Sequence, residues 1–477
     1  MSWLGRAGGR MTASEPAAWR RLHPASFFVN LVPTAWRTLW NLWPLVVGAI
    51  WGRQQGGAID AILILFFSFT AVVRTLLHFL TLRYRLFDGR LEIQSGLFSR
   101  VEQAFDPSRI QNVSIRQNLF HRMAGLVELR VEMAGASGLL ASDGLLSALS
   151  MADAEALRAG IGRPGTAVHD EGQSLDAPGL LEVVAFGVSS SRAGLAGASV
   201  ALTLDLSQRL APGTLPSAPS GTAGWLGLAL LSVAGGYVLS VGAAVLRWYR
   251  ARWWVEGETL HFESGLLTRR RVDIPTRKLQ LVQVSEPIVR RAMGYASLLF
   301  DTAASGQPPE SGETLTEGVV PMVAHEDIDH RVRVAFPGLD ATLAGALEPP
   351  ARAAVLAALL GDALAWAIPV AFLVGLTEQA GFLLLMPAAL LVSWLDVRWQ
   401  GWAVTAEFMV MRRGFLSRST WVLPRRKLQS VRWEQGPVER ALGIGSVVVW
   451  YPGGRLPLPL MEEKRGKQVF AILNRTG

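Results

Sequence analysis

A frame of five residues occurs three times along the chain, with the same spacing each time. A glycine is followed by an arginine 4 residues later, a glutamine 15 later, an arginine 26 later and a glycine 29 later. The frame consists of Gly96, Arg100, Gln111, Arg122 and Gly125, then Gly265, Arg269, Gln280, Arg291 and Gly294, then Gly414, Arg418, Gln429, Arg440 and Gly443. This repetition indicates three copies of one structural module.

Each copy predicts a small β-rich module built on a curled antiparallel sheet. Apolar and polar residues alternate, as in Leu91–Ser95 and Leu129–Met133. The first glycine lets a strand turn sharply, and the next arginine lies on the following strand. A proline begins a further strand, and the second glycine ends a short helical turn. The prolines are Pro107, Pro275 and Pro424, and the closing helices are expected at Leu145–Ile161, Ile328–Val334 and Glu462–Leu473.

Apolar blocks precede every copy in pairs. Hydrophobic residues make up 50% of the chain and charged residues 18%, against about 25% charged in an ordinary soluble domain. The blocks are Trp36–Trp51 and Ile59–Leu80, Leu180–Leu206 and Trp225–Leu246, and Ala353–Leu376 and Ala380–Leu395. They predict six membrane spans in three helical hairpins. A count of five remains open, because Ser189–Arg192 interrupts the third block and Leu180–Val188 could lie along the membrane interface.

Arginines flank the hairpins on the side of the modules. The net charge is +8, and the rule that cytoplasmic flanks are basic places the modules in the cytoplasm. The absence of cysteine excludes disulfides and thiolate chemistry. The expected division is a cytoplasmic tail at 1–35, hairpins at 36–82, 180–250 and 341–398, modules at 83–163, 251–340 and 399–477, and a linker at 164–179.

The repeated pattern resembles a known family. Gly-[Leu/Phe]-[Leu/Phe]-[Ser/Thr]-Arg, followed by a Pro–Arg–Gln–Val segment and Arg-x-x-Gly, resembles the bacterial pleckstrin-homology-like domain. Three copies behind three hairpins resemble the YdbS/YdbT-like family of multi-pass membrane proteins. The resemblance implies membrane α-helical hairpins joined to three pleckstrin-homology-like modules, each a curled antiparallel sheet with a C-terminal helix. It also implies a multi-pass protein of the bacterial cytoplasmic (inner) membrane with no established catalytic activity, a role in envelope integrity or resistance to membrane-active agents, and a companion membrane protein with a single module as a partner.

The repeated arginines admit two interpretations. Arg100, Arg122, Arg269, Arg291, Arg418 and Arg440, with Arg109, Arg277 and Arg426, could bind anionic phospholipid headgroups. Alternatively, they hold corners of the sheet by binding carbonyl or carboxylate groups, which we favour. The first hairpin turns, at Asp88, Glu256–Glu258 and Thr405–Glu407, are acidic or neutral. They argue against the basic inositol-phosphate site of eukaryotic pleckstrin-homology domains.

These observations predict a non-enzymatic membrane scaffold with no cofactor and no metal. The histidines of His325–His330 are five apart, which does not stack them on one helix face. The alternative is a transporter or channel, which would use Asp362 and Arg192, the ionisable residues deepest in the spans; Asp60 and Arg74 lie near span ends. Nucleic acid is an unlikely partner, since only the net charge suggests it.

Overall fold

The computed structural model describes residues 19–26, 29, 66, 69–70, 72–73, 76–77, 80–87, 90–95, 101–107, 110–133, 144–161, 178–190, 221–302, 318–339, 347–377 and 380–474. They divide into two compact units, of which the first comprises residues 1–133 and 142–169 and the second residues 134–141 and 170–477. Most of the first hairpin, including Asp60 and Arg74, lies outside the described residues, as do Arg192, Gly96, Arg100 and Arg109.

The first unit contains the first module. One antiparallel sheet has the strand order β1-β2-β3-β4, and β5, β6 and β7 pair in turn with one another. The strands are β1 (Arg20–Arg21), β2 (Arg83–Phe87), β3 (Arg90–Ser95), β4 (Val101–Phe105), β5 (Ile110–Gln117), β6 (Leu126–Met133) and β7 (Gly144–Ser150), and the helices are α4 (Leu119–Met123) and α5 (Met151–Gly160). Residues of both sets of strands and of α5 share one apolar core, with Leu91, Ile110 and Leu129 fully buried.

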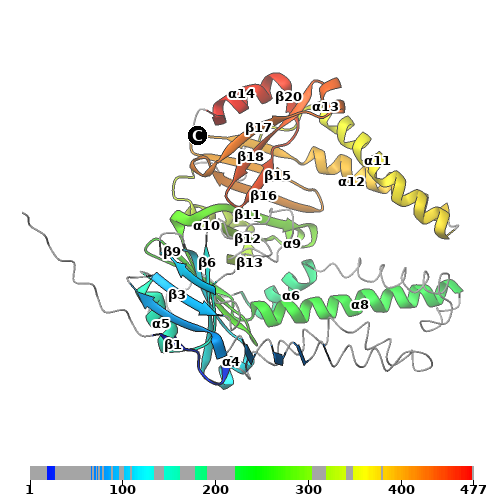
Figure 1. Ribbon diagram of the computed structural model, residues 1–477. Helices are drawn as coiled ribbons and strands as arrows, with labels where there is room; N and C mark the ends of the chain where they lie inside the picture. The colour runs from blue at the N-terminus through cyan, green and yellow to red at the C-terminus, as the bar shows by residue number, and fades with distance from the viewer. Residues whose placement is uncertain are drawn as a thin grey trace, which may run out of the picture. The chain divides into compact units, whose positions relative to one another are not determined.

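The second unit contains the second and third modules (Figure 1). Its strands are β8 (Arg252–Glu256), β9 (Thr259–Ser264), β10 (Arg269–Pro275), β11 (Leu279–Pro287), β12 (Tyr295–Thr302), β13 (Gly318–Ala324), β14 (Gly401–Val404), β15 (Phe408–Arg413), β16 (Ser417–Pro424), β17 (Ser430–Glu434), β18 (Ile444–Tyr451), β19 (Gly454–Pro457) and β20 (Met461–Glu462). Its shorter helices are η1 (Thr276–Lys278), α9 (Ile288–Ala292), η3 (His325–Asp327), α10 (Ile328–Ala335), η5 (Arg425–Lys427), α13 (Pro437–Ala441) and α14 (Glu463–Asn474).

The two modules of this unit do not form separate sheets. A six-stranded antiparallel sheet runs β13-β12-β11-β16-β15-β14, so its first half belongs to the second module and its second half to the third. Strands β8, β9 and β10 pair with one another, and β17, β18 and β19 form the last sheet, with β20 on β18. Each module therefore divides its strands between two sheets.

Among the described residues of the second unit, three helices are long and apolar enough to cross a membrane. These segments are Leu230–Trp248 in α8 (Gly221–Trp248), Arg352–Phe372 in α11 (Arg352–Thr377), and Ala380–Arg398, which covers η4 (Ala380–Leu384) and α12 (Leu385–Arg398). The shorter α6 (Leu180–Ser189) packs antiparallel on α8, where Ser240 donates a hydrogen bond of 2.9 Å to the carbonyl of Gly187. Its end at Ser189 agrees with the interruption in the third apolar block.

Two local predictions were wrong. Leu145–Ser150, expected to be helical, is strand β7, and helix α5 begins only at Met151. Ala148 has a φ of +70° next to a register shift opposite Val127, so a bulge interrupts the alternation that would have identified the strand. Pro275 and Pro424 end strands β10 and β16 instead of beginning strands. A strand end tolerates proline equally well, because no ladder N–H is needed there.

Candidate functional site

The second and third modules are joined by their main chains. Strands β11 and β16 pair antiparallel, with Val282 opposite Val422 and Glu286 opposite Arg418. On one face of the joint, Val282 and Val284 share a core cluster with Phe408 and Val410 of the third module. On the other face, Leu281 belongs to the core of the third module. The two modules therefore fold as one body, since neither core is complete without the other.

An ion pair closes this joint. Arg418 donates from Nε to Oε2 of Glu286 at 2.8 Å and from Nη2 to Oε1 at 2.6 Å. Glu286 is only 3% exposed, and Nδ1 of His325 lies 3.3 Å from its Oε1. Burial, followed by the positive charge of Arg418, lowers the pKa of nearby Arg412. This two-pronged, buried geometry is the strong form of an arginine–carboxylate contact, and it uses the Arg418 guanidinium for structure.

Helix α9 of the second module receives the glycine loop of the third. Nη2 of Arg291 donates to the carbonyl of Phe415 at 3.2 Å, and its guanidinium carbon lies 5.9 Å from the centre of the Phe415 ring. The backbone N–H of Ile288 donates to the carbonyl of Leu416 at 2.6 Å. Arg291 and Arg418 occupy different positions of the repeated frame. Both nevertheless contribute to the joint between the second and third modules.

The glycine loops of the second and third modules also attach each of these modules to its preceding helix. The N–H of Gly265 donates to Tyr249 and that of Leu266 to Leu246, at 3.0 and 2.9 Å, at the end of α8. In the third module the N–H of Phe415 donates to Oδ1 of Asp396 on α12 at 2.8 Å. Gly265 has a φ of +115°, and a Cβ there would lie 1.9 Å from the carbonyl oxygen of Thr268. The close turn therefore needs glycine.

The remaining repeated residues are dispersed. Gly125, Gly294 and Gly443 follow the short helices α4, α9 and α13 in the left-handed conformation expected of a helix end. Gln280 is buried and donates to the carbonyl of Lys278 at 3.2 Å. The side chain of Gln111 lies outside the described residues. The exposed members are Arg122, Arg269, Gln429 and Arg440, with Arg277 and Arg426 also exposed.

Two central residues were missed because they differ between copies. Glu286 corresponds to Gln117 and Gln435, and Arg290 corresponds to His121 and Glu439. Arg290 is fully buried and binds helix α6: its Nε donates to Ser189 at 3.1 Å and its Nη2 to Ser190 at 2.6 Å. Its guanidinium carbon lies 4.4 Å from the Phe186 ring centre. Because Glu286 and Arg290 are not shared by the three copies, the repeat does not point to them. The one sign of Arg290 in the sequence is that it stands next to Arg291.

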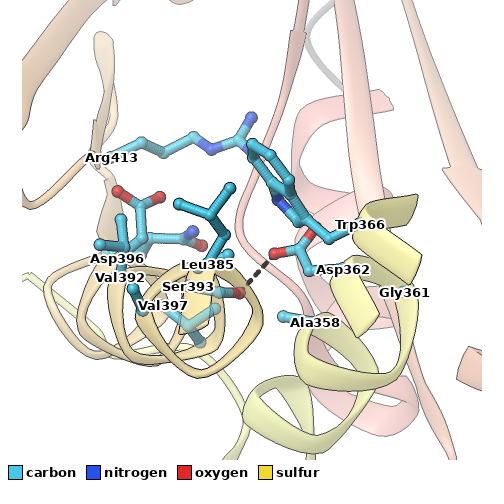
Figure 2. A pocket seen from close by; sticks show the side chains of 13 residues that line it. Ala358, Gly361, Asp362, Trp366, Leu385, Val392, Ser393, Asp396, Val397 and Arg413 are labelled. Carbon is cyan, nitrogen blue, oxygen red and sulfur yellow. Dashed lines mark hydrogen bonds between the residues drawn. The ribbon is translucent and has the colours of Figure 1, made fainter. Parts of the chain in front are cut away.

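A cavity of about 610 Å³ with a mixed polar and apolar lining lies between α11 and α12 of the third hairpin (Figure 2). Ser393 donates a short hydrogen bond to Oδ2 of Asp362 across the two helices. Trp366, Asp396, Gln400 and Arg413 complete its polar and aromatic lining. Asp362 therefore joins the two helices of its own hairpin, and its suggested partner Arg192 is outside the described residues. Among those residues, no group of three or more His, Cys, Asp or Glu is arranged to hold a metal ion.

Comparison with known proteins agrees with this architecture. The chain matches the bacterial PH domain family over residues 33–164, 205–333 and 352–476. It is 22% identical over 455 residues to the UPF0699 transmembrane protein YdbT of Bacillus subtilis (strain 168), covering 88% of this chain and 90% of that protein. No solved structure matches it. The family match and the apolar helices confirm the expected fold class: the chain is a membrane protein that belongs to the bacterial PH domain family and carries three regions of that family.

Proposed function

We propose that this protein is a non-enzymatic multi-pass scaffold of the bacterial cytoplasmic membrane. Its three modules face the cytoplasm and present surfaces to protein partners, such as a companion single-module membrane protein, or to anionic lipid. The observation that carries this proposal is the sheet shared by β11 and β16. The continuous sheet and its ion pair make the second and third modules one rigid body, called the platform below. The charged groups Arg418 and Glu286 bind one another and hold this platform together.

The end of the platform that adjoins the helices is apolar. Leu267 and Leu416 in the glycine loops and Ile288, Val289 and Met293 around α9 are all exposed large hydrophobic side chains. The loops bond to the ends of α8 and α12, and α9 bonds to the loop at Leu416. Exposed apolar side chains at a helix end that enters the bilayer fit the membrane interface. Exposed Arg269 at the same loop would then meet anionic headgroups.

The cytoplasmic orientation is supported by charge. Arg247, Arg250 and Arg252 follow the span in α8, and Arg398 ends α12. Basic residues within a few positions of a span end mark its cytoplasmic side. Both ends of the third hairpin adjoin the third module: the N–H of Ala351, just before α11, donates to the carbonyl of Leu460, just before β20, and α12 leads directly into β14.

The scaffold role is tested by disrupting the platform in cells. A strain that lacks the protein should become more sensitive to a membrane-active agent, and the wild-type chain should restore resistance. Glu286→Ala, which leaves the partly buried Arg418 without its carboxylate, should restore less resistance than Arg277→Ala, a change at an exposed arginine of η1, at equal membrane levels. Equal rescue by the two variants would contradict the proposal that the joined platform is the functional element.

The second candidate function is transport, favoured by the cavity that contains Asp362. It predicts that leucine at both Asp362 and Arg192 abolishes function without lowering the amount of protein in the membrane. The scaffold proposal predicts that a folded Asp362→Asn variant, which keeps the shape of the side chain and a group able to bond Ser393, retains full resistance. Loss of resistance in that variant at normal membrane levels would favour transport.

A further inference from the structure

The two strands that join the second and third modules, β11 and β16, have equivalents in the other modules. The third module carries an equivalent of β11, and the first module carries an equivalent of β16. The hairpins around the first glycine have one register: Ser95 pairs with Val101, Ser264 with Arg270, and Arg413 with Ser419. Each pair lies one residue before and five residues after its glycine, so β4 is the equivalent of β16. By the frame that aligns Gln280 with Gln429, β17 is the equivalent of β11.

Strand β17 lacks the cover that its equivalent has. Val282 and Val284 on β11 are 0% and 2% exposed beneath the third module. Their counterparts on β17, Val431 and Trp433, are only partly buried. Among the described strands, β17 ends its sheet, whose order is β17-β18-β19. The apolar side chains that β11 buries against a neighbouring module are thus present on β17, beside an edge with no described strand.

Strand β4 of the first module likewise lacks the cover that its equivalent, β16, has. On β16, Thr420 and Val422 are buried against the second module. The equivalent residues on β4, Glu102 and Ala104, are exposed. Strand β4 is the last strand of the order β1-β2-β3-β4 among those described. One chain therefore carries two sheet edges without a described neighbour: β17, which is equivalent to β11, and β4, which is equivalent to β16.

We propose that β17 of one copy pairs with β4 of a second copy, repeating between molecules the joint that β11 and β16 make within one. The register of that joint places Val431 opposite Ala104 and Glu434 opposite Val101. In the repeated frame, Gln435 corresponds to Glu286 and Arg100 to Arg418. Main-chain hydrogen bonds hold the edges, as in other strand additions, and the pairing covers Val431. Because the contact is head-to-tail, it generates rows or rings. It rests on the proposed function only in requiring that every copy has its modules on the same side of the membrane.

The joint between copies is weaker than the internal one. Gln435 stands where Glu286 stands, so the partner of arginine is a neutral amide in place of a carboxylate. In the single chain, Gln435 donates from Nε2 to the carbonyl of Ile444 at 2.8 Å. A neutral contact suits association that depends on the amount of protein in the membrane.

The cysteine-free chain allows a direct test by disulfide cross-linking in native membranes. The double variant Val101→Cys/Glu434→Cys should form a ladder of covalent dimers and larger species. Two chains with different tags, one Val101→Cys and the other Glu434→Cys, should form only the mixed dimer. Ser285→Cys/Ser419→Cys places cysteines at the equivalent internal positions, which pair opposite one another, and should link within one chain.

In a mismatched control, the second cysteine is placed at Arg455 instead of Glu434. Arg455 is an exposed residue of β19 that pairs with Trp450. Val101→Cys/Arg455→Cys should give no ladder. Monomers from Val101→Cys/Glu434→Cys, under conditions where the internal pair links, would overturn the proposal. So would a link from Glu434→Cys to a different membrane protein without links between copies. Labelling each module cysteine from the cytoplasmic side shows separately whether the common orientation holds.

A gain of association provides an independent test. Gln435→Glu restores the carboxylate of the internal joint, and the mixed-dimer fraction at low expression should rise about fivefold, as expected for replacing a neutral hydrogen bond by a charge-assisted one. Adding Arg100→Ala should remove the gain. If Gln435→Glu leaves the fraction unchanged or lowers it in folded protein, the proposed register is wrong.

Discussion

Glu286 and Arg418 lie directly opposite one another on strands β11 and β16, one in the second module and the other in the third. Two hydrogen bonds of 2.6 and 2.8 Å join them, and the carboxylate is almost wholly buried. An arginine that occurs in every copy of the repeat thus serves, in the third copy, to fix one module to the next. The same residue type in the second copy, Arg269, is exposed.

Removing one partner of this pair should destabilise the joined modules. Glu286→Ala leaves the partly buried guanidinium of Arg418 without its carboxylate, and we expect a loss of about 1.5–3 kcal/mol of unfolding free energy. The measurement is urea unfolding of the full chain in nanodiscs. Arg269→Ala, at the exposed equivalent of Arg418, is the matched control and should change stability by less than about 0.5 kcal/mol. Similar effects for both variants would show that the pair is not the closure of the joint.

The turn at Gly414 should not accept a side chain. Its φ is +92°, and a Cβ would lie 2.1 Å from the carbonyl oxygen of Ser417. Gly257 also has a positive φ, but open space surrounds it. Gly257→Ala should therefore cost only the backbone term of about 1–2 kcal/mol, while Gly414→Ala should cost clearly more. Thermal unfolding of both variants checks this order, and an equal loss would exclude a steric role for the turn.

The first unit should lose stability in mild acid through His121. Burial lowers the pKa of this histidine from its ordinary value of 6.5, and neither ring nitrogen has a hydrogen-bond partner among the described residues. The folded state thus favours the neutral ring. The stability it contributes is complete above pH 6.5 and falls as the pH drops below that value, because the unfolded state binds the proton more readily.

The measurement for His121 is the melting temperature at pH 7.5 and 5.5, in the wild type and in His121→Leu. The leucine variant should show a smaller decrease on acidification, since it has no buried ring to protonate. A decrease of the same size in both proteins would assign the acid sensitivity to other groups.

The residues shared by the three copies made the modules predictable. The first glycines indicated sharp turns, and Gly265 and Gly414 have positive φ values there. The second glycines indicated short helices, which are α4, α9 and α13. The third pair of apolar blocks corresponds closely to α11 and to the segment of η4 and α12. Each of these features is local, so spacing and residue type were sufficient to predict it.

The joint between modules could not be predicted in the same way. Strand β11 pairs with β16 across 130 residues of chain, as Pro287 and Ser417 show at one end of the ladder. Main-chain pairing leaves little trace in residue type, and the distinguishing side chain, Glu286, is a glutamine in the other two copies. Arg290 and its serine partners on α6 were missed for the same reason. Contacts made by residues of a single copy cannot be predicted from the residues that all three copies share.

The most direct test of the proposed scaffold is the sidedness of its modules. Single cysteines at Arg269, Arg440 and Glu378 can be treated with a membrane-impermeant maleimide in intact spheroplasts and again after permeabilisation. The scaffold predicts that Arg269→Cys and Arg440→Cys react only after permeabilisation, whereas Glu378→Cys, between α11 and η4 in the sequence, reacts in intact spheroplasts. Labelling of either module cysteine in intact spheroplasts would contradict a platform on the cytoplasmic face.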